Sequence, residues 1–359
     1  MVEGNGPYRL PEDLEAEDLV LEKNNFSWNN MADVLYIDQP YCTGYSTCNS
    51  SILLPKTGKE ITDSLLTFLS NFTSIHPEYK HRDLYLTGHE FAGHFLPTLS
   101  LHLLNLQSLT SHPVYSDTLL SMRLKALLMG GAHIEPSIQD PTYLAFAMEK
   151  GLVGITDYQI SMLGFAFCRV YLGIGWKSAA EYACKMSLQQ IMGVTYRKFN
   201  PYNFKQNCEI PENRFCHNWT RIHEFYARED VRRELGVGER EWNLLEKRLV
   251  EELEEEDLVG YLEDLKTVLG RIKVYLYYGD MDFISNWEGG FNVVKSLGKE
   301  YEDVFKQNLW NEWYLEGNIE AEYITALKMT FVRIYNSGHF EALDHPAFSF
   351  TLLNRVISS

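Results

Sequence analysis

A short turn flanked by two glycines is the first place where this sequence could do chemistry. Residues 84–95 read L-Y-L-T-G-H-E-F-A-G-H-F, an apolar run that ends at Gly88 and is followed by Glu90 and Gly93. This is the spacing of G-x-S-x-G, in which a sharp strand-to-helix turn exposes the middle side chain and the second glycine lets the helix pack closely. The sequence therefore predicts such a turn with a carboxylate, Glu90, in the place of a serine nucleophile.

Two further candidates follow apolar runs near the end of the chain. Asp282 lies in G-D-M-D-F-I-S-N, and His339 follows Gly338. The order turn residue, Asp, His is one of the chain orders in which catalytic triads occur. Acyl transfer needs a nucleophile, a base, an orienting carboxylate and donors for the oxyanion. The sequence thus offers a base in His339 and an orienting acid in Asp282, but no hydroxyl between them.

The elements that must position these residues alternate between two patterns. Apolar β-branched and aromatic runs alternate with helical periodicity, which is typical of parallel βαβ units. Strands are expected at 33–40, 83–88, 125–130, 272–279 and 329–336. Helices are expected at 57–73, 91–106, 239–268, 287–298 and 346–357. The acidic run at 251–257 is interrupted by leucines at roughly helical spacing, so it is expected to be the solvated face of an amphipathic helix.

Several segments together resemble the serine carboxypeptidase family of α/β-hydrolases. The turn is similar to the family's T-G-E-S-Y-A-G-H-Y-x-P. The other matches are N-G-P-Y-R-L at 5–10 to E-N-G-P-x-R-L, FSWNNMADVLYIDQPYCTGYS at 26–46 to Y-S-W-N-x-x-A-N-V-L-F-L-D-Q-P-x-G-T-G-F-S, 130–136 to G-N-G-x-x-D-P, 279–286 to G-D-x-D-x-I-C-N, and 338–346 to G-H-M-V-P-x-D-x-P. They are collinear over almost the whole chain.

The resemblance implies an α/β-hydrolase fold, with a mostly parallel central sheet and a helical insertion over the site. The core would comprise 1–136 and 239–359, and the insertion 137–238. It also implies removal of C-terminal residues from peptides by a Ser-Asp-His triad without a metal or organic cofactor. A peptide or protein C-terminus would be the ligand. Glu90, Asp282 and His339 occupy the triad positions.

The resemblance assigns Gly88 and His89 to substrate binding. His89 stands where the family has a glutamate that recognises the terminal carboxylate of the substrate. The glutamate of E-N-G-P aligns with Gly4, so recognition of that carboxylate is expected to be altered.

Glu90 is expected to prevent hydrolysis. A carboxylate that attacks a peptide carbonyl gives a mixed anhydride, which favours reversal, and known carboxylate nucleophiles act on other bond types. We expect His339 to lie between the carboxylates of Asp282 and Glu90 as part of an ion cluster. The chain would then be an inactive member with a binding or scaffold role. The alternatives are an active hydrolase of altered chemistry that uses Glu90, or an enzyme whose recorded sequence is truncated or faulty.

The family has a segment N-G-G-P-G-C-S-S upstream of E-N-G-P, and this sequence begins after it. That segment supplies an oxyanion donor, so its loss also argues against hydrolysis. The strand that precedes it in the fold lies between the strands matching 33–40 and 83–88. Orphaned backbone groups in a sheet centre are costly. We therefore expect direct pairing of these two strands, instability, or a protein partner that completes the sheet.

Composition limits the other classes of function. The net charge of -17 disfavours nucleic acid and anionic lipid as partners, and the 45% hydrophobic content suits a large buried core. No apolar run approaches the roughly 18–20 residues that cross a bilayer. The first residues lack the pattern of a signal peptide. The resemblance suggests a secretory or vacuolar origin, and the sequence leaves the compartment undetermined.

Cysteines and histidines allow several readings. The resemblance implies a disulfide between Cys208 and Cys216, and Cys42 and Cys48 are close enough in sequence to pair. Cys168 and Cys184 are expected to be buried small hydrophobes. His89, His94 and His133 are expected to be structural rather than metal ligands. The sequons begin at Asn25, Asn49, Asn71 and Asn218 and permit glycosylation.

Overall fold

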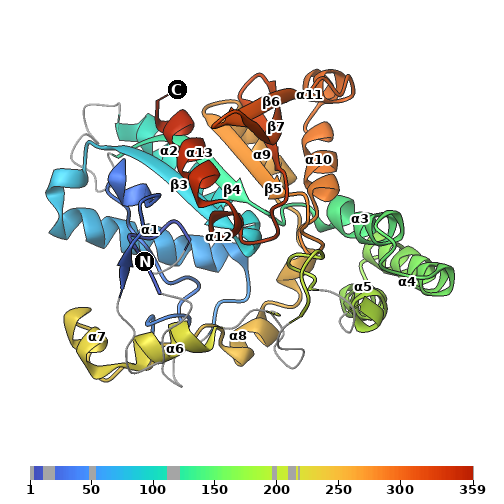
Figure 1. Cartoon of the computed structure of the whole chain (residues 1–359), viewed down its shortest axis with the longest axis horizontal. Helices are drawn as coiled ribbons and strands as arrows, with labels where there is room; N and C mark the ends of the chain where they lie inside the picture. Colours follow the sequence, from blue (N-terminus) through green and yellow to red (C-terminus); the bar gives the residue numbers. More distant parts are fainter. Residues whose placement is uncertain are drawn as a thin grey trace.

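A six-stranded sheet forms the centre of the molecule (Figure 1). The computed structural model describes residues 4–10, 21–47, 54–110, 122–195, 200–208, 216 and 219–358. Its strands, in the spatial order β3-β4-β5-β8-β7-β6, are β3 (Asp83–His89), β4 (Arg123–Gly130), β5 (Lys273–Gly279), β6 (Asn311–Leu315), β7 (Asn318–Ala326) and β8 (Met329–Ile334). The first four in this order are parallel, whereas β7 and β6 are antiparallel additions. A separate two-stranded sheet pairs β1 (Tyr8–Arg9) with β2 (Glu22–Lys23).

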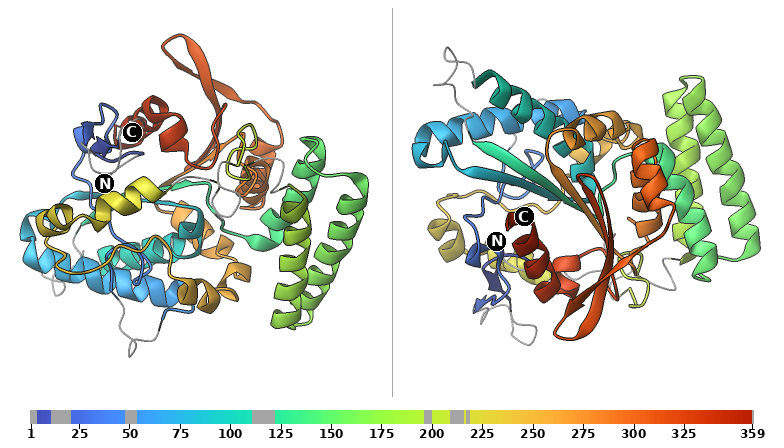
Figure 2. Two further views of the ribbon diagram at one scale, coloured as in Figure 1. Left: turned by 60° about the horizontal axis from the view of Figure 1, so that its bottom comes forward. Right: turned by 90° about the horizontal axis from the view of Figure 1, so that it is seen from above.

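Helices cover both faces of this sheet (Figure 2). They are α1 (Gly58–Ile75), α2 (Leu96–Thr110), α3 (Pro136–Glu149), α4 (Ile155–Gly173), α5 (Lys177–Thr195), α6 (Thr220–Ala227), α7 (Glu229–Glu234), α8 (Lys247–Glu252), α9 (Leu262–Leu269), α10 (Trp287–Lys295), α11 (Lys299–Phe305), α12 (Glu341–Asp344) and α13 (Pro346–Ile357), with 3-10 turns η2 (Trp28–Asn30), η3 (Pro77–Tyr79), η4 (Glu90–His94) and η5 (Glu256–Leu258). None of the helices in the described ranges is both long and apolar enough to cross a membrane.

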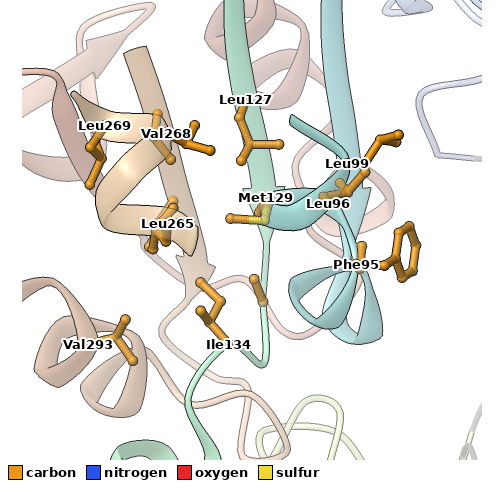
Figure 3. Close-up of a cluster of buried hydrophobic side chains, with 14 of the residues drawn as sticks. Phe95, Leu96, Leu99, Leu127, Met129, Ile134, Leu265, Val268, Leu269 and Val293 are labelled. Atoms are coloured by element: carbon orange, nitrogen blue, oxygen red, sulfur yellow. The ribbon is translucent and has the colours of Figure 1, made fainter. Parts of the chain in front are cut away.

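The core lies between the sheet and these helices. Figure 3 shows Leu127 and Met129 of β4 facing leucines of α2 and α9. On the opposite face Leu128 packs with a second cluster that includes residues of α13. Strands buried on both faces read as continuous apolar runs rather than as alternating ones, which is why β4 and β5 were predictable from sequence. The α/β-hydrolase fold expected from the resemblance is confirmed.

The expected strand at 33–40 is wrong. This segment has no strand assignment, and β3 lies at the edge of the sheet with β4 as its neighbour. A strand exists only with a neighbour to bond, and the described part of the chain provides none beside 33–40. The direct pairing of 33–40 with β3, one of the expected outcomes, is therefore not formed.

The expected helix at 239–268 is also wrong. The structure has two short helices, α8 and α9, separated by η5 and a non-helical stretch. At Gly260 a Cβ would come within 2.0 Å of the Glu135 carboxylate, so the chain is closely packed there. Of the acidic run, Glu256 is buried and accepts a hydrogen bond from the Tyr261 hydroxyl, so the run is not one solvated face.

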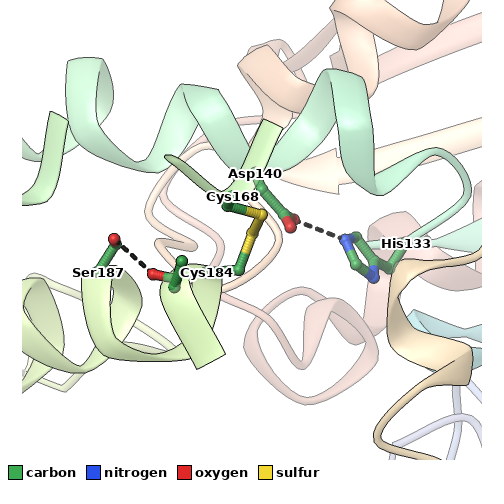
Figure 4. Close-up of a disulfide and its surroundings, with 6 residues drawn as sticks. His133, Asp140, Cys168, Cys184 and Ser187 are labelled. Carbon is green, nitrogen blue, oxygen red and sulfur yellow. Dashed lines mark hydrogen bonds and ion pairs between the residues drawn. A yellow bond between two sulfur atoms is a disulfide. The ribbon is translucent and has the colours of Figure 1, made fainter. Parts of the chain in front are cut away.

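The cysteine pairings agree only in part with expectation. The disulfide between Cys208 and Cys216 is confirmed. Cys168 and Cys184 form a second disulfide that joins α4 to α5, so their reading as free buried thiols is wrong (Figure 4). Cys48 and its pairing with Cys42 lie outside the described residues.

Two expectations from sequence stay predictions. The division into core parts 1–136 and 239–359 with an insertion at 137–238 is one of them. Glycosylation is the other: Asn25 and Asn71 are exposed, and Asn49 and Asn218 lie outside the described residues.

Candidate active site

The glycine-flanked turn has the shape that its sequence predicts. β3 ends at His89, η4 begins at Glu90, and α2 follows. Glu90 has a φ of 49°, a left-handed conformation that is uncommon for a residue with a side chain. Such outliers cluster at functional turns, where the surrounding structure holds them.

Both glycines are required by close packing. A Cβ on Gly88 would lie 2.5 Å from the Ala92 Cβ, and a Cβ on Gly93 would lie 2.1 Å from the backbone oxygen of His133. A hydrogen bond also stabilises the turn: the His133 N–H donates to the Glu90 backbone oxygen, with 3.0 Å between the nitrogen and the oxygen. Gly88 therefore shapes the turn through its missing side chain.

The Glu90 carboxylate bonds to its own turn. Its Oε2 accepts a hydrogen bond from the N–H of Phe91 at 2.9 Å. In hydrolases with this turn, the N–H after the nucleophile is one of the donors that stabilise the oxyanion. In this chain a side-chain oxygen already occupies that donor.

Asp282 and His339 form a buried pair. Asp282 follows β5 and His339 follows β8, so two neighbouring parallel strands bring them to one edge of the sheet. The His339 Nδ1 donates to Asp282 Oδ2 at 2.9 Å, and Asp282 Oδ1 accepts from the Ser285 N–H at 3.1 Å. Asp282 is fully buried and His339 is 5% exposed. This is the base and orienting-acid arrangement of a catalytic triad.

Of the two carboxylates expected beside His339, only Asp282 makes a direct contact with it. No hydrogen bond or ion pair joins Glu90 to His339, although both residues are described. The Asp282 half of the arrangement is present.

A second histidine stands next to the pair instead. The rings of His89 and His339 meet edge to face, with centroids 4.4 Å apart. His89 Nε2 donates to Glu341 Oε2 at 2.9 Å. Burial lowers the pKa of His89, but the charge of Glu341 and its hydrogen bond outweigh burial, with smaller help from Asp282 and Glu90, and raise that pKa to about 9. An imidazolium at His89 therefore borders the Asp282–His339 pair at neutral pH.

Sequence reasoning missed Glu341. Its side chain is buried, and it is the only partner of His89 among the ion pairs of the described residues. The signal was present, because Glu341 stands where the family pattern G-H-M-V-P has an apolar residue. A new charge at that position, together with His89 in place of a glutamate, indicates an ion pair that the family pattern does not contain.

His94 and His133 belong to a second group of hydrogen-bonded polar side chains. Figure 4 shows His133 against Asp140, whose Oδ1 accepts from Nε2 at 2.9 Å. His94 Nε2 lies 3.2 Å from the His133 Nδ1. Burial lowers the pKa of His133, but Asp140 outweighs it and raises that pKa to about 9, whereas burial and the neighbouring His133 lower the pKa of His94. Within the described ranges no three His, Cys, Asp or Glu side chains are grouped to hold a metal ion.

A large cavity opens beside the turn. Its volume is about 1640 Å³, and Gly88, His89 and Glu90 lie on its wall. The wall continues along β3 and also contains residues of the segment 31–40, within which the sequence predicted a strand at 33–40.

Comparisons with known proteins agree with this geometry. A model of the serine carboxypeptidase family matches residues 1–359. Serine carboxypeptidase 3 of Hordeum vulgare is 25% identical over 366 residues, which cover 98% of this chain and 67% of that protein. Pheromone-processing carboxypeptidase kex1 of Aspergillus oryzae is 27% identical over 375 residues, which cover 98% of this chain and 57% of that protein. The chain thus spans between 57% and 67% of the length of these two relatives.

A solved structure gives the same fold. The crystal structure of KEX1(DELTA)P, a prohormone-processing carboxypeptidase from Saccharomyces cerevisiae, superposes with a TM-score of 0.83 at 22% sequence identity and covers 99% of this chain and 79% of that one. Because the family model matches the sequence from its first residue to its last, this chain belongs to the serine carboxypeptidase family.

Proposed function

We propose that this chain is a serine carboxypeptidase-like protein that does not hydrolyse peptides and that binds an extended peptide segment beside its elbow turn. The observation that carries the first part is Glu90, which sits at the tip of the turn with its carboxylate bonded to the Phe91 N–H. A serine hydroxyl at this position would be a nucleophile once His339 took its proton. A carboxylate has no such proton to give.

Two features of Glu90 oppose acyl transfer. Attack by its carboxylate on a peptide would give a mixed anhydride with a good leaving group attached, and the reverse reaction would be favoured. The N–H that would stabilise the oxyanion also donates to Glu90 itself. Removing one oxyanion donor costs a factor of about 100–1000 in kcat in hydrolases where it has been tested.

The ion pair at His89 supports a change in ligand as well. The family resemblance places residue 89 where the terminal carboxylate of a substrate is recognised. The His89 imidazolium is already neutralised by Glu341, so a free C-terminal carboxylate gains little by approaching it. We infer that the ligand is not selected by its terminus.

The open edge of β3 supports binding of an extended segment. Backbone groups on the free edge of a strand are ready to pair with an added strand. The cavity along this edge is walled by side chains of α1 on one face of the sheet and of α13 on the other; they include Leu65, Leu69, Phe72, Leu353 and Ile357. Both faces are apolar, so the segment would be apolar on both faces, as buried parallel strands are.

Activity measurements test the first part. The wild-type protein, incubated with blocked dipeptides and with a serine-directed fluorophosphonate, is expected to match a Glu90→Ala variant. Labelling or turnover above that variant would overturn the inactive assignment.

Peptide binding tests the second part. The probe is a fluorescent peptide rich in Val and Leu, with lysines for solubility and both termini blocked. Binding is expected, and it is expected to disappear when alternate residues of the peptide are proline, because proline cannot donate to a strand ladder. Leu86→Arg, on the cavity wall, should abolish binding, whereas Leu309→Arg, at an exposed site away from it, should not. Equal binding of the proline peptide would contradict strand addition.

One observation favours a second candidate, an active hydrolase of altered chemistry. The Asp282–His339 pair is intact and buried, although the proposed function makes no use of it. In this reading Glu90 would be the reacting group. The activity measurement above distinguishes the two, because only this candidate predicts turnover that depends on Glu90.

A further inference from the structure

Helix α4 carries apolar side chains on two opposite faces. One face is buried and contains Ser161, Phe165 and Cys168, the last of which is tied to α5 by the disulfide. A surface helix normally has one apolar stripe and a polar back. The back of α4 is apolar too, so this helix has more apolar surface than the described residues of the chain cover.

The exposed stripe has a regular spacing. It consists of Ile160, Leu163, Phe167 and Val170, followed by Ile174 at the cap of the helix, and these five residues are called the α4 seam. The steps are three, four, three and four residues, which is the a/d spacing of a helix that packs along another helix. Each seam side chain is between 52% and 58% exposed.

The seam is open to a large partner. Figure 1 places α4 at the edge of the molecule, and both views of Figure 2 show the α4–α5 hairpin standing out from the part that contains the sheet. Gly164, on the side towards α5, allows close packing there, because a Cβ at this residue would meet the Ser187 hydroxyl at 2.0 Å. The hairpin is thus firmly packed on one side and bare on the other.

The charges on α4 argue against a lipid surface as the partner. Asp157 and Arg169 are the only charged residues of the helix, and Asp157 accepts a hydrogen bond from Gln190 of α5. Helices that lie on membranes carry a strongly charged, Lys- and Arg-rich polar face, which is absent here. The net charge of -17 adds repulsion from anionic headgroups.

The same features suit a second copy of the chain. Two copies with this net charge repel one another, and the repulsion is smallest when they meet through a surface without charges of its own, such as the seam. An aromatic side chain buries roughly 150–250 Å² in full, so a half-exposed seam residue offers on the order of 100 Å², and five from each copy reach the ~1,000 Å² of a specific interface. The exposed side chains of Trp176 and Tyr182 lie on the same hairpin. We propose that the chain forms a two-fold dimer in which the α4 seams of two copies pack against each other.

Sedimentation over a series of protein concentrations tests the dimer. The wild-type chain is expected to sediment as a pair, and Leu163→Glu is expected to weaken association by about 100-fold or more, because a central interface position is charged. Met162→Glu is the matched control. It places the same charge one residue away on the same helix but off the seam, and it should retain the pair.

Three results would overturn the proposal. They are a wild-type chain that sediments alone at every concentration, a Leu163→Glu variant that still pairs, and a seam-dependent attachment to phosphatidylcholine or phosphatidylserine vesicles in place of pairing. Far-ultraviolet circular dichroism establishes that each variant is folded. If Leu163→Glu does not fold, Phe167→Glu takes its place.

Discussion

The turn at Glu90 has kept the geometry of a catalytic site while its chemistry differs. The left-handed backbone, the two close-packed glycines and the buried Asp282–His339 pair are all present. What differs is the side chain at the tip and the two charges at His89 and Glu341. Function in this fold depends on the site rather than on the fold. Residue 90 is therefore the one triad position at which this sequence departs from the family pattern.

Substituting Glu90 by serine tests this at the residue scale. The Glu90→Ser variant would place a hydroxyl at the tip of the turn and free the Phe91 N–H for the oxyanion. We expect labelling by a fluorophosphonate at least ~10-fold above that of the wild-type protein, because the base and its orienting acid are already paired. Labelling should be lost again in Glu90→Ser combined with His339→Ala. A folded Glu90→Ser protein that remains unlabelled would mean that His339 does not reach residue 90.

At the scale of the elements, sequence patterns succeeded where an element is defined by its own residues. The expected ranges for β3, β4, β5, β8, α1 and α13 agree with the structure to within a few residues. The positions of Asp282 and His339 followed, because each lies just after a recognisable strand. The Cys208–Cys216 disulfide was implied by the family resemblance.

The errors arose where an element depends on distant parts of the chain. The segment 33–40 has strand-like residues but no neighbour to pair with in the described part of the chain. The region 239–268 is divided by packing against Glu135 and Ile134. The antiparallel strands β6 and β7 were not predicted. The disulfide between Cys168 and Cys184 depends on how α4 folds back on α5, which spacing alone does not fix.

The close packing of η4 against the loop after β4 allows a prediction about stability. Gly93→Ala is expected to destabilise the protein by about 1–3 kcal/mol, because the new Cβ would overlap the His133 backbone oxygen and backbone yields less than a side chain. Urea unfolding measures the loss. Gly173→Ala is the control, since nothing lies within 4 Å of its Cβ position. Equal stability of both variants would show that the turn can relax at no cost.

The disulfide of the α4–α5 hairpin allows a second prediction about stability. The Cys168–Cys184 disulfide closes a loop with a sequence separation of 16. A loop of this size stabilises by about 3 kcal/mol, mainly by restricting the unfolded chain. The double variant Cys168→Ala, Cys184→Ala should therefore unfold at a lower urea concentration by about that free energy. Proteolysis should then cut first within residues 155–195. A first cut elsewhere would show that the hairpin is held by its packing alone.

Considered as a whole, the described part of the molecule combines the α/β-hydrolase fold with three surfaces that it leaves uncovered. The edge of β3 lacks a neighbouring strand in the described chain, the cavity beside it is walled by apolar side chains, and the α4 seam faces solvent. Each of these is costly for an isolated chain, since exposed apolar patches and open strand edges promote association. They are the surfaces on which the binding role proposed above rests.

Two partly buried imidazolium ions make the stability of the whole protein depend on pH. His89 and His133 have pKa values raised from 6.5 to about 9 in the folded state by Glu341 and Asp140. A raised histidine pKa stabilises the fold fully below the unfolded value, and this stabilisation is lost as pH rises from about 6.5 through about 9. His94, whose pKa is lowered, acts in the opposite sense and weakens the fold only when pH falls below the pKa that this histidine has in the unfolded chain.

The free energy of unfolding should therefore fall between pH 7 and pH 9.5, with His133 contributing on the order of 1–3 kcal/mol. Urea unfolding at each pH measures this fall. Asp140→Asn and Glu341→Gln should each flatten the curve, whereas Asp63→Asn, at an exposed surface pair, should leave its slope unchanged. An alkaline slope that survives both substitutions would place the responsible protons elsewhere in the chain.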